Sequence, residues 1–180
     1  HPETRAAESF KIDSKTAADY RSQGFGVVLS HSQDGIIRGT SALVSLAEKD
    51  ETESLLKSDA ASQLSFRKGN SQQSYPSSQM GIIALIKQTY YDLDWYKGLK
   101  KHEEKNLSLE AFDKWQTLPQ IFDAGDKFAV SRADKIGDEF KVQYVFKTNG
   151  NDYQRVNDIV KTQGKLIIPL NFPEAFDVED

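Results

Sequence analysis

The sequence predicts an α/β protein with mostly parallel strands, flanking helices and one antiparallel hairpin. Residues 118–172 indicate this class most clearly, because short apolar runs alternate there with amphipathic segments. In the first amphipathic segment apolar residues recur at every third or fourth position, as on the buried face of a helix. Strands that alternate with helices of this length predict right-handed crossovers and a parallel sheet. Ligands of such sheets bind beyond the carboxyl ends of the strands.

The first elements expected along the chain are a short helix and a strand. Asp13 or Ser14 is suited to cap a helix over residues 14–23, and Gly24 is suited to end it. Residues 26–30 then form a short apolar run, which predicts a strand. We expect this strand to be parallel to the later ones.

A hairpin is expected next. Residues 36–46 alternate weakly between apolar and polar side chains, and Gly35 and Gly39 interrupt the pattern. An irregular strand explains this better than a helix does. Residues 55–66 are suited to be the antiparallel partner. The hairpin would then lie as an excursion between the first parallel strand and the next helix.

Two helices are expected in the middle of the chain. The longer covers residues 80–104 and follows a polar loop in which Pro76 and Ser77 predict the helix start. Its apolar stripe predicts a core-facing helix and consists of Ile82, Ile83, Leu85, Ile86, Thr89, Tyr90, Leu93 and either Trp95 or Tyr96. Asn106 opens the shorter helix, over residues 108–117.

The last third of the chain predicts three further strands and two helices. The strands are expected at residues 118–124, 142–146 and 165–172, and the helices at residues 126–140 and 153–164. The buried face of the first of these helices is expected to hold Phe128, Val130, Ala133, Ile136 and Phe140. With residues 26–30 the parallel candidates are too few to close an eight-stranded barrel. We therefore expect an excised segment with exposed sheet edges.

The composition predicts a soluble globular chain of one domain. Of the 180 residues, 38% are hydrophobic and 28% are charged, and no apolar run approaches the roughly 18 residues that span a bilayer. The net charge of -4 gives no general attraction to phosphate groups, so we expect neither a nucleic-acid nor a membrane partner. Without cysteine the chain fits a cytoplasmic or an exported protein. It begins at His1 without a targeting signal, which indicates a processed protein or a piece of a longer one.

Three residues at predicted strand ends are candidate ligand-binding residues. His31 follows the first strand and is either a ligand or a loop histidine bonded to nearby backbone. Asp123 ends a strand, where its carboxylate is suited to bind a metal, to act as a general base, or to accept from backbone amides. Asn149 opens a turn that would hold an anion on amides near Gly150, or be capped by the side chains at residues 151–152.

Other polar residues have simpler explanations. Arg38, Thr40 and Ser41 form either a binding loop or the solvated face of an alternating strand. Asp126 is expected to cap the helix that follows it. The histidines, including His1 and His102, show no metal-binding spacing, and no nucleotide-binding or nucleophile motif occurs.

Four sequence segments, taken together and in order, give the chain a resemblance to a known protein family. The chain contains RGTSALV at residues 38–44, YPSSQMGIIALIKQT at residues 75–89, LPQIFDAGDKFAVSRADKIGDEF at residues 118–140 and IIPLNFP at residues 167–173. In this order they resemble the amidohydrolase superfamily, in particular large bacterial proteins that look like imidazolonepropionase. The resemblance covers nearly the whole chain. It implies the middle of a metal-dependent (β/α)8 barrel of the TIM type.

The resemblance also implies a chemistry and its site. The family hydrolyses carbon–nitrogen bonds of the cyclic amide type, other than peptide bonds, with a metal-activated water. Histidines that end the fifth and sixth barrel strands bind the metal. In this chain Asp123 stands at the first of these positions, and residues 145–149 cover the second without a histidine. A lone aspartate makes a weaker and harder site than histidine nitrogens do.

Two interpretations follow from the resemblance. In one, the chain is a segment of an amidohydrolase-like protein, and zinc or another divalent metal is held in the full-length parent. In the other, it belongs to a catalytically degenerate structural or interaction barrel that supports an active domain in the same polypeptide. In both, the partners are the parent polypeptide and further copies at exposed sheet edges. We predict that the isolated segment has no cofactor and no activity.

Overall fold

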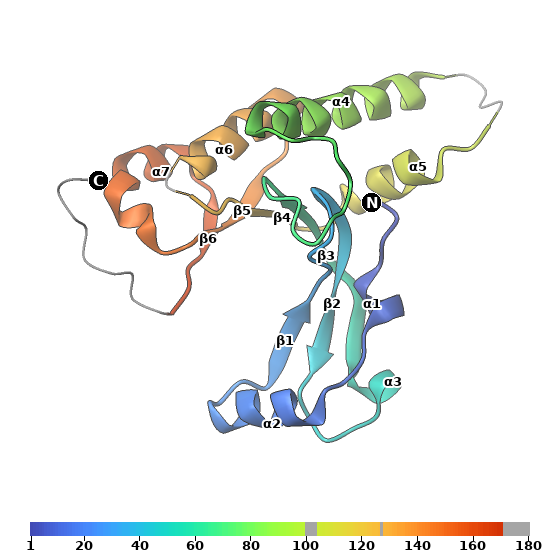
Figure 1. The fold of residues 1–180 in the computed structure, drawn as a ribbon, viewed down its shortest axis with the longest axis vertical. Coiled ribbons are helices and arrows are strands. Elements are labelled where there is room, and N and C mark those ends of the chain that lie inside the picture. The colour runs from blue at the N-terminus through green and yellow to red at the C-terminus, as the bar shows by residue number, and fades with distance from the viewer. Residues whose placement is uncertain (100–103, 127, 171–180) are drawn as a thin grey trace. The chain divides into compact units, whose positions relative to one another are not determined.

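The computed structural model describes residues 1–99, 104–126 and 128–170 (Figure 1). The chain divides into two compact units, residues 1–120 and residues 121–180. Compact units are not by themselves domains, so the single domain expected from the sequence stays a prediction. His102 and the acidic tail after residue 170 lie outside the described residues. Within the described ranges, no helix has the length and apolar character needed to cross a membrane.

The first unit contains an antiparallel sheet. Strand β2 (Ile37–Ser45) lies between β1 (Val27–Ser30) and β3 (Leu55–Ser65) and is antiparallel to both. The predicted hairpin is therefore confirmed, with Ser41 opposite Ala61 in its register.

The parallel pairing expected for the first strand is wrong. β1 runs antiparallel to β2, with Leu29 opposite Leu43. The reason is the short connection at residues 31–36. A parallel neighbour needs a crossover of roughly a dozen residues or more, whereas antiparallel strands can be joined by a short loop.

The first unit also contains five helices among its described residues. They are α1 (Ala6–Ser9), α2 (Ser14–Ser22), α3 (Glu51–Ser54), α4 (Gln79–Gly98) and α5 (Leu107–Trp115). Asp13 caps α2 as predicted, because its side chain accepts from the Lys15 amide. Ser78 caps α4 through the Gly81 amide, just after the predicted start signal at Pro76 and Ser77, and the helix begins one residue before the predicted range. Asn106 caps α5 in the same way, through the Leu109 amide.

Helix α4 buries part of the predicted stripe, namely Ile82, Ile86, Tyr90 and Leu93, and decides between its two aromatic candidates. Tyr96 is buried, whereas the neighbouring Trp95 is 65% exposed. The Tyr96 hydroxyl donates to Glu110 Oε1 on α5 over 3.1 Å. The rings of Tyr90 and Phe112, one from each helix, lie 4.9 Å apart. These contacts join α4 to α5.

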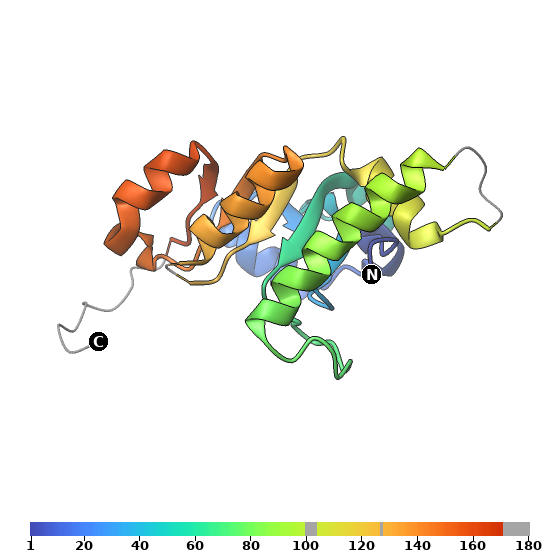
Figure 2. The same ribbon diagram turned by 90° about the horizontal axis from the view of Figure 1, so that it is seen from above.

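The second unit contains the strand–helix–strand pattern predicted from the sequence. Its elements are β4 (Gln120–Asp123), α6 (Ala129–Phe140), β5 (Tyr144–Lys147), the 3-10 helix η1 (Asn151–Arg155), α7 (Val156–Thr162) and β6 (Lys165–Ile167). The first residue of β4 is the last residue of the first unit. Strands β5 and β6 are parallel, with Phe146 opposite Leu166, so this part of the parallel prediction is confirmed. Helix α6 packs against β5 (Figure 2).

A close approach between α6 and β5 requires a glycine. A Cβ atom on Gly137 would collide with the Val142 carbonyl and press on the ring of Tyr144. Beneath the helix, the Tyr144 ring lies 5.2 Å from that of Phe122 and 6.2 Å from that of Phe146. All three rings are buried. Of the predicted α6 face, the middle residues are buried, whereas Phe128 is 40% exposed.

Candidate functional site

The ends of β4 and β5 hold two of the three candidate residues. Asp123 is the last residue of β4, and Asn149 lies two residues beyond β5. The two strand ends are neighbours, because the Ala124 amide donates to the Lys147 carbonyl over 2.9 Å. Asn149 Nδ2 then donates to the Gly125 carbonyl over 3.0 Å. The structure thus brings the loops of both candidates together.

A second contact joins the same two loops. The guanidinium of Arg155, on η1, lies 4.5 Å from the centre of the Phe128 ring, just before α6. Arg132 approaches the same ring at 5.6 Å. A guanidinium over an aromatic face is attracted by the ring quadrupole. The β4–α6 loop and the β5–η1 loop are therefore held by a hydrogen bond and by a cation–π contact.

The turn after β5 is built from its own polar side chains. Asp152 Oδ2 accepts from the Gly150 amide over 3.3 Å, as the capping interpretation predicts. The role expected of the Asn151 side chain belongs to Asn149, whose Oδ1 accepts from the Asn151 amide over 3.1 Å. A carboxylate already occupies this turn, which opposes the binding of an anion on the Gly150 amide.

The metal implied by the family resemblance would need several ligands at these strand ends. Both polar atoms of the Asn149 amide are engaged by backbone groups. Among the described residues, no group of three or more histidine, cysteine, aspartate or glutamate side chains is placed to hold a metal ion. Asp123 alone does not supply the several ligands that zinc or magnesium needs. The residues present therefore do not fit a complete metal site.

The third candidate, His31, belongs to the first unit. Its ring is half-buried, and Nδ1 lies 2.8 Å from the Ser32 carbonyl. A carbonyl only accepts, so Nδ1 carries the proton in this bond. This contact is the one expected of a loop histidine bonded to nearby backbone.

The polar cluster on β2 is buried, so neither a free binding loop nor a solvated strand face describes it. Arg38, Thr40 and Ser41 are each no more than 4% exposed. Arg38 donates to the carbonyls of Gly35 over 2.9 Å and Arg67 over 3.0 Å. The Thr40 amide also bonds to the N-terminal segment, so this segment helps to cover β2. The local sequence pattern does not reveal that contact.

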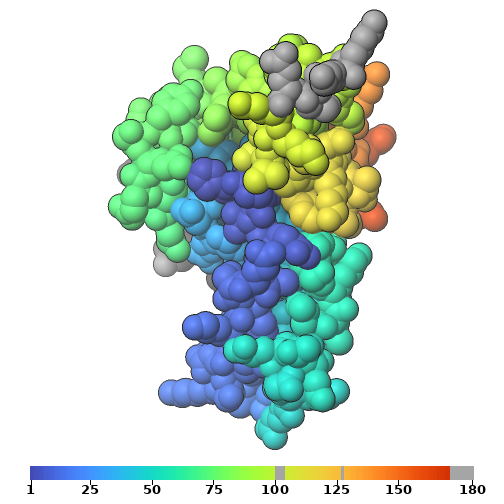
Figure 3. All heavy atoms as spheres, turned by 90° about the vertical axis from the view of Figure 1, so that its right-hand side faces the viewer, coloured from blue at the N-terminus to red at the C-terminus, as the bar shows by residue number. Residues whose placement is uncertain are grey.

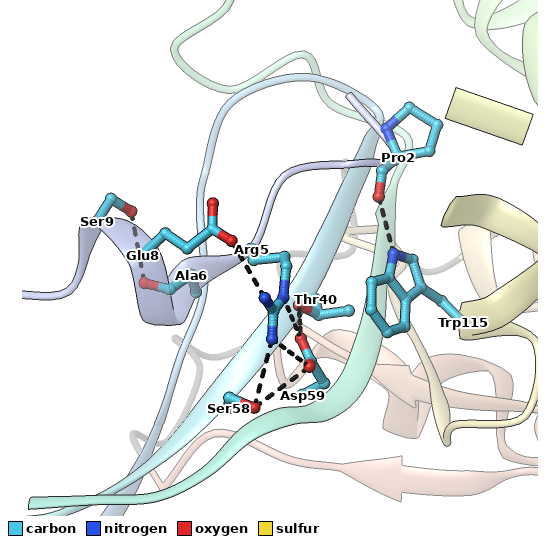
Figure 4. Close-up of polar contacts among 9 residues, drawn as sticks. All are labelled: Pro2, Arg5, Ala6, Glu8, Ser9, Thr40, Ser58, Asp59 and Trp115. Atoms are coloured by element: carbon cyan, nitrogen blue, oxygen red, sulfur yellow. Dashed lines mark hydrogen bonds and ion pairs between the residues drawn. The ribbon is translucent and has the colours of Figure 1, made fainter. Parts of the chain in front are cut away.

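Sequence reasoning missed the polar network around Asp59 (Figure 4). Arg5 donates to both oxygens of this carboxylate, and Thr40 Oγ1 donates to Oδ1 over 2.8 Å. The Arg5 bonds are the main reason why the pKa of the Asp59 carboxyl lies below its ordinary value. Arg5 and Asp59 are 54 residues apart, so no local sequence signal could have paired them. The network fastens the N-terminal segment to the hairpin.

Comparison with known proteins gives one solved structure of similar fold. No protein-family model and no curated protein matches the chain. The crystal structure of an amidohydrolase from Thermotoga maritima MSB8 matches with a TM-score of 0.76 and 17% sequence identity. The fold is amidohydrolase-like. The match covers 94% of this chain and 49% of the amidohydrolase chain, so this chain spans about half of that protein's length.

This likeness supports the coarser part of the sequence-based prediction. An amidohydrolase-like fold with strands of both directions and flanking helices agrees with the predicted α/β class. At 17% identity the likeness concerns the fold and not the chemistry. The TIM-type barrel and the roles of His31, Asp123 and Asn149 stay predictions.

Proposed function

We propose that this chain is a segment of an amidohydrolase-like protein whose parent hydrolyses carbon–nitrogen bonds other than peptide bonds, of the cyclic amide type, with a metal-activated water. The fold likeness to a solved amidohydrolase over nearly the whole chain carries this proposal. The imidazolonepropionase-like motifs in the sequence favour the cyclic amide class. The zinc or other divalent metal is assigned to the parent, and no step through it is assigned to the residues of this chain.

A second candidate function is a structural or interaction barrel that has lost its catalytic site. The contact from Asn149 to Gly125 and the contact from Arg155 to Phe128 favour it. Both contacts fasten the loops at strand ends, where an α/β enzyme places its reacting groups. In this function the strand ends stabilise a framework, and an active domain elsewhere in the polypeptide performs the chemistry.

Two measurements on the natural polypeptide that contains this chain distinguish the two proposed functions: its content of bound metal and its hydrolysis of cyclic amides. Hydantoin and dihydrouracil serve as cyclic amide probes. Bound zinc or manganese, together with hydrolysis that a chelator abolishes, would support the hydrolase. Folded polypeptide without metal and without turnover of either probe would support the framework. The 180-residue chain by itself is expected to show neither metal nor turnover.

Substitution of Asp123 tests whether this residue binds the metal of the proposed hydrolase. If it ligates the metal, Asp123→Ala lowers the bound metal and the activity together. Asp138→Asn, which changes an exposed carboxylate on α6, should leave both unchanged. If Asp123 has a structural role only, both variants keep their metal.

The expected association of copies at sheet edges is also a proposal. In the described part of the first unit, β2 is the strand that pairs with β1. Val27 and Leu29 on β1 are 49% and 37% exposed. An edge strand with exposed apolar residues favours pairing with another strand. Sedimentation of the chain over a range of concentrations tests for such pairing.

A further inference from the structure

The turn after β5 contains a pair of residues, Asn149 and Gly150, whose chemistry neither proposed function uses. The side-chain amide of an asparagine can close a five-membered ring onto the backbone nitrogen of the next residue. A side chain on that next residue hinders the attack, and glycine has none. Gly150 follows Asn149, whereas every other asparagine of the sequence is followed by a residue with a side chain. Asn149 is exposed, so water reaches it.

In the folded chain the atoms that would react are held in hydrogen bonds. Asn149 Nδ2, the leaving group, donates to the Gly125 carbonyl over 3.0 Å. Asn149 Oδ1 accepts from the Asn151 amide over 3.1 Å. The attacking nitrogen, that of Gly150, donates its proton to Asp152 Oδ2 over 3.3 Å. Departure of Nδ2 breaks the bond to Gly125, so the closed turn opposes the reaction.

The product of the reaction cannot restore this contact. An aspartate at position 149 has two acceptor oxygens and no amide proton for the Gly125 carbonyl. The alternative product, isoaspartate, also adds one carbon to the backbone between Thr148 and Gly150. In both products the bond between the β5–η1 loop and the β4–α6 loop is lost.

We propose that Asn149–Gly150 is a site of spontaneous deamidation, which the closed strand-end loops protect and which releases these loops irreversibly once it reacts. The Gly150 nitrogen attacks Asn149 Cγ, so that a new N–C bond forms and the Cγ–Nδ2 bond breaks. Nδ2 leaves as ammonia and takes the proton of the Gly150 amide with it. One water molecule then opens the succinimide at either carbonyl and gives aspartate or isoaspartate.

The second contact between the two loops makes the protection testable. Arg155 lies 4.5 Å from the centre of the Phe128 ring and takes no part in the hydrogen bonds of Asn149. Arg155→Met removes this contact, together with an ion pair to Asp158. Lys161→Met removes the other ion pair of Asp158 and leaves the Phe128 contact in place, so it is the matched control.

Deamidation is measured on the 180-residue chain at neutral pH and physiological temperature, by digestion and mass spectrometry of the fragment that contains Asn149. A synthetic peptide of residues 144–155 gives the rate without the folded contacts. The folded chain should react about tenfold more slowly than the peptide, because the reaction waits for local opening of the loops. Arg155→Met should raise the rate in the chain severalfold, and Lys161→Met should leave it unchanged.

A second measurement tests the release of the loops. Asn149→Asp reproduces one product and should make amide hydrogen exchange at residues 124–126 faster, because the bond to the Gly125 carbonyl is lost. Asn157→Asp adds the same charge at an exposed position on α7 and should leave that exchange unchanged. Unchanged exchange on α6 reports that the second unit of each variant is folded.

Three results would overturn the proposal. The first is deamidation of the folded chain at least as fast as that of the peptide. The second is a rate in Arg155→Met no higher than in the wild type. The third is wild-type exchange at residues 124–126 in Asn149→Asp.

Discussion

Arg5 meets Asp59 through two parallel hydrogen bonds, from Nε to Oδ1 at 3.0 Å and from Nη2 to Oδ2 at 2.6 Å. The pair joins the segment before α1 to β3, across 54 residues of chain. The bidentate geometry is the strongest that an arginine and a carboxylate can form. Both side chains are partly shielded from water, with 34% and 18% of their surfaces exposed.

Removal of this pair should destabilise the first unit. Arg5→Met is expected to cost about 1–3 kcal/mol of unfolding free energy, because Asp59 is left partly buried with fewer partners. Urea unfolding measures the loss. The matched control is Lys161→Met, which breaks an exposed ion pair with Asp158 and should cost less than about 0.5 kcal/mol. Equal losses in the two variants would contradict a special role for Arg5.

The same pair predicts a dependence of stability on pH. The pKa of Asp59 is lowered in the folded state, chiefly by the Arg5 hydrogen bond, so the folded protein binds this proton less readily than the unfolded chain. Its stabilisation is complete above the ordinary value of 3.8 and is lost as the pH falls through the lower folded value. Urea unfolding between neutral and acidic pH should show a steeper decline for the wild type than for Asp59→Asn. Parallel declines would contradict this assignment.

Asn149 should stabilise the strand ends of the second unit. Asn149→Ala removes the bond to the Gly125 carbonyl and is expected to cost about 1 kcal/mol. Amide hydrogen exchange at residues 124–126 should become faster. Asn157→Ala is the control, since Asn157 is exposed on α7 and its loss should be neutral or slightly stabilising. Unchanged exchange in the Asn149 variant would show that other contacts hold the loops.

Gly137 should tolerate no side chain. Gly137→Ala is expected to cost about 1–3 kcal/mol, because the new methyl group collides with the Val142 carbonyl and α6 must move away from β5. Thermal unfolding measures this cost. At Gly98, the last residue of α4, the space around a Cβ is open, so Gly98→Ala should be neutral or stabilising by up to about 1 kcal/mol. A stable Gly137 variant would mean that the α6–β5 spacing adapts.

Local signals in the sequence predicted most of the elements correctly. The Asp13 cap, the hairpin of β2 and β3, and the parallel pair β5 and β6 follow from side-chain periodicity and turn residues. These signals act over a few residues, because helix caps and alternating strands are set by near neighbours. The direction of β1 was wrong, although the shortness of the connection at residues 31–36 carried the information.

By itself the sequence determined the order and type of the longer elements, but not α1, α3 and η1, and placed Asp123 and Asn149 at strand ends. Only the tertiary structure decided that Asn149 holds Gly125, that Arg38 is buried between two loops, and that Arg5 pairs with Asp59. A cavity of about 370 Å³ was decided in the same way, because the start of β2, the loop before α4, and helices α4 and α5 meet on the face shown in Figure 3. Periodicity reports which face of an element is apolar, whereas partners and cavities depend on which distant faces meet.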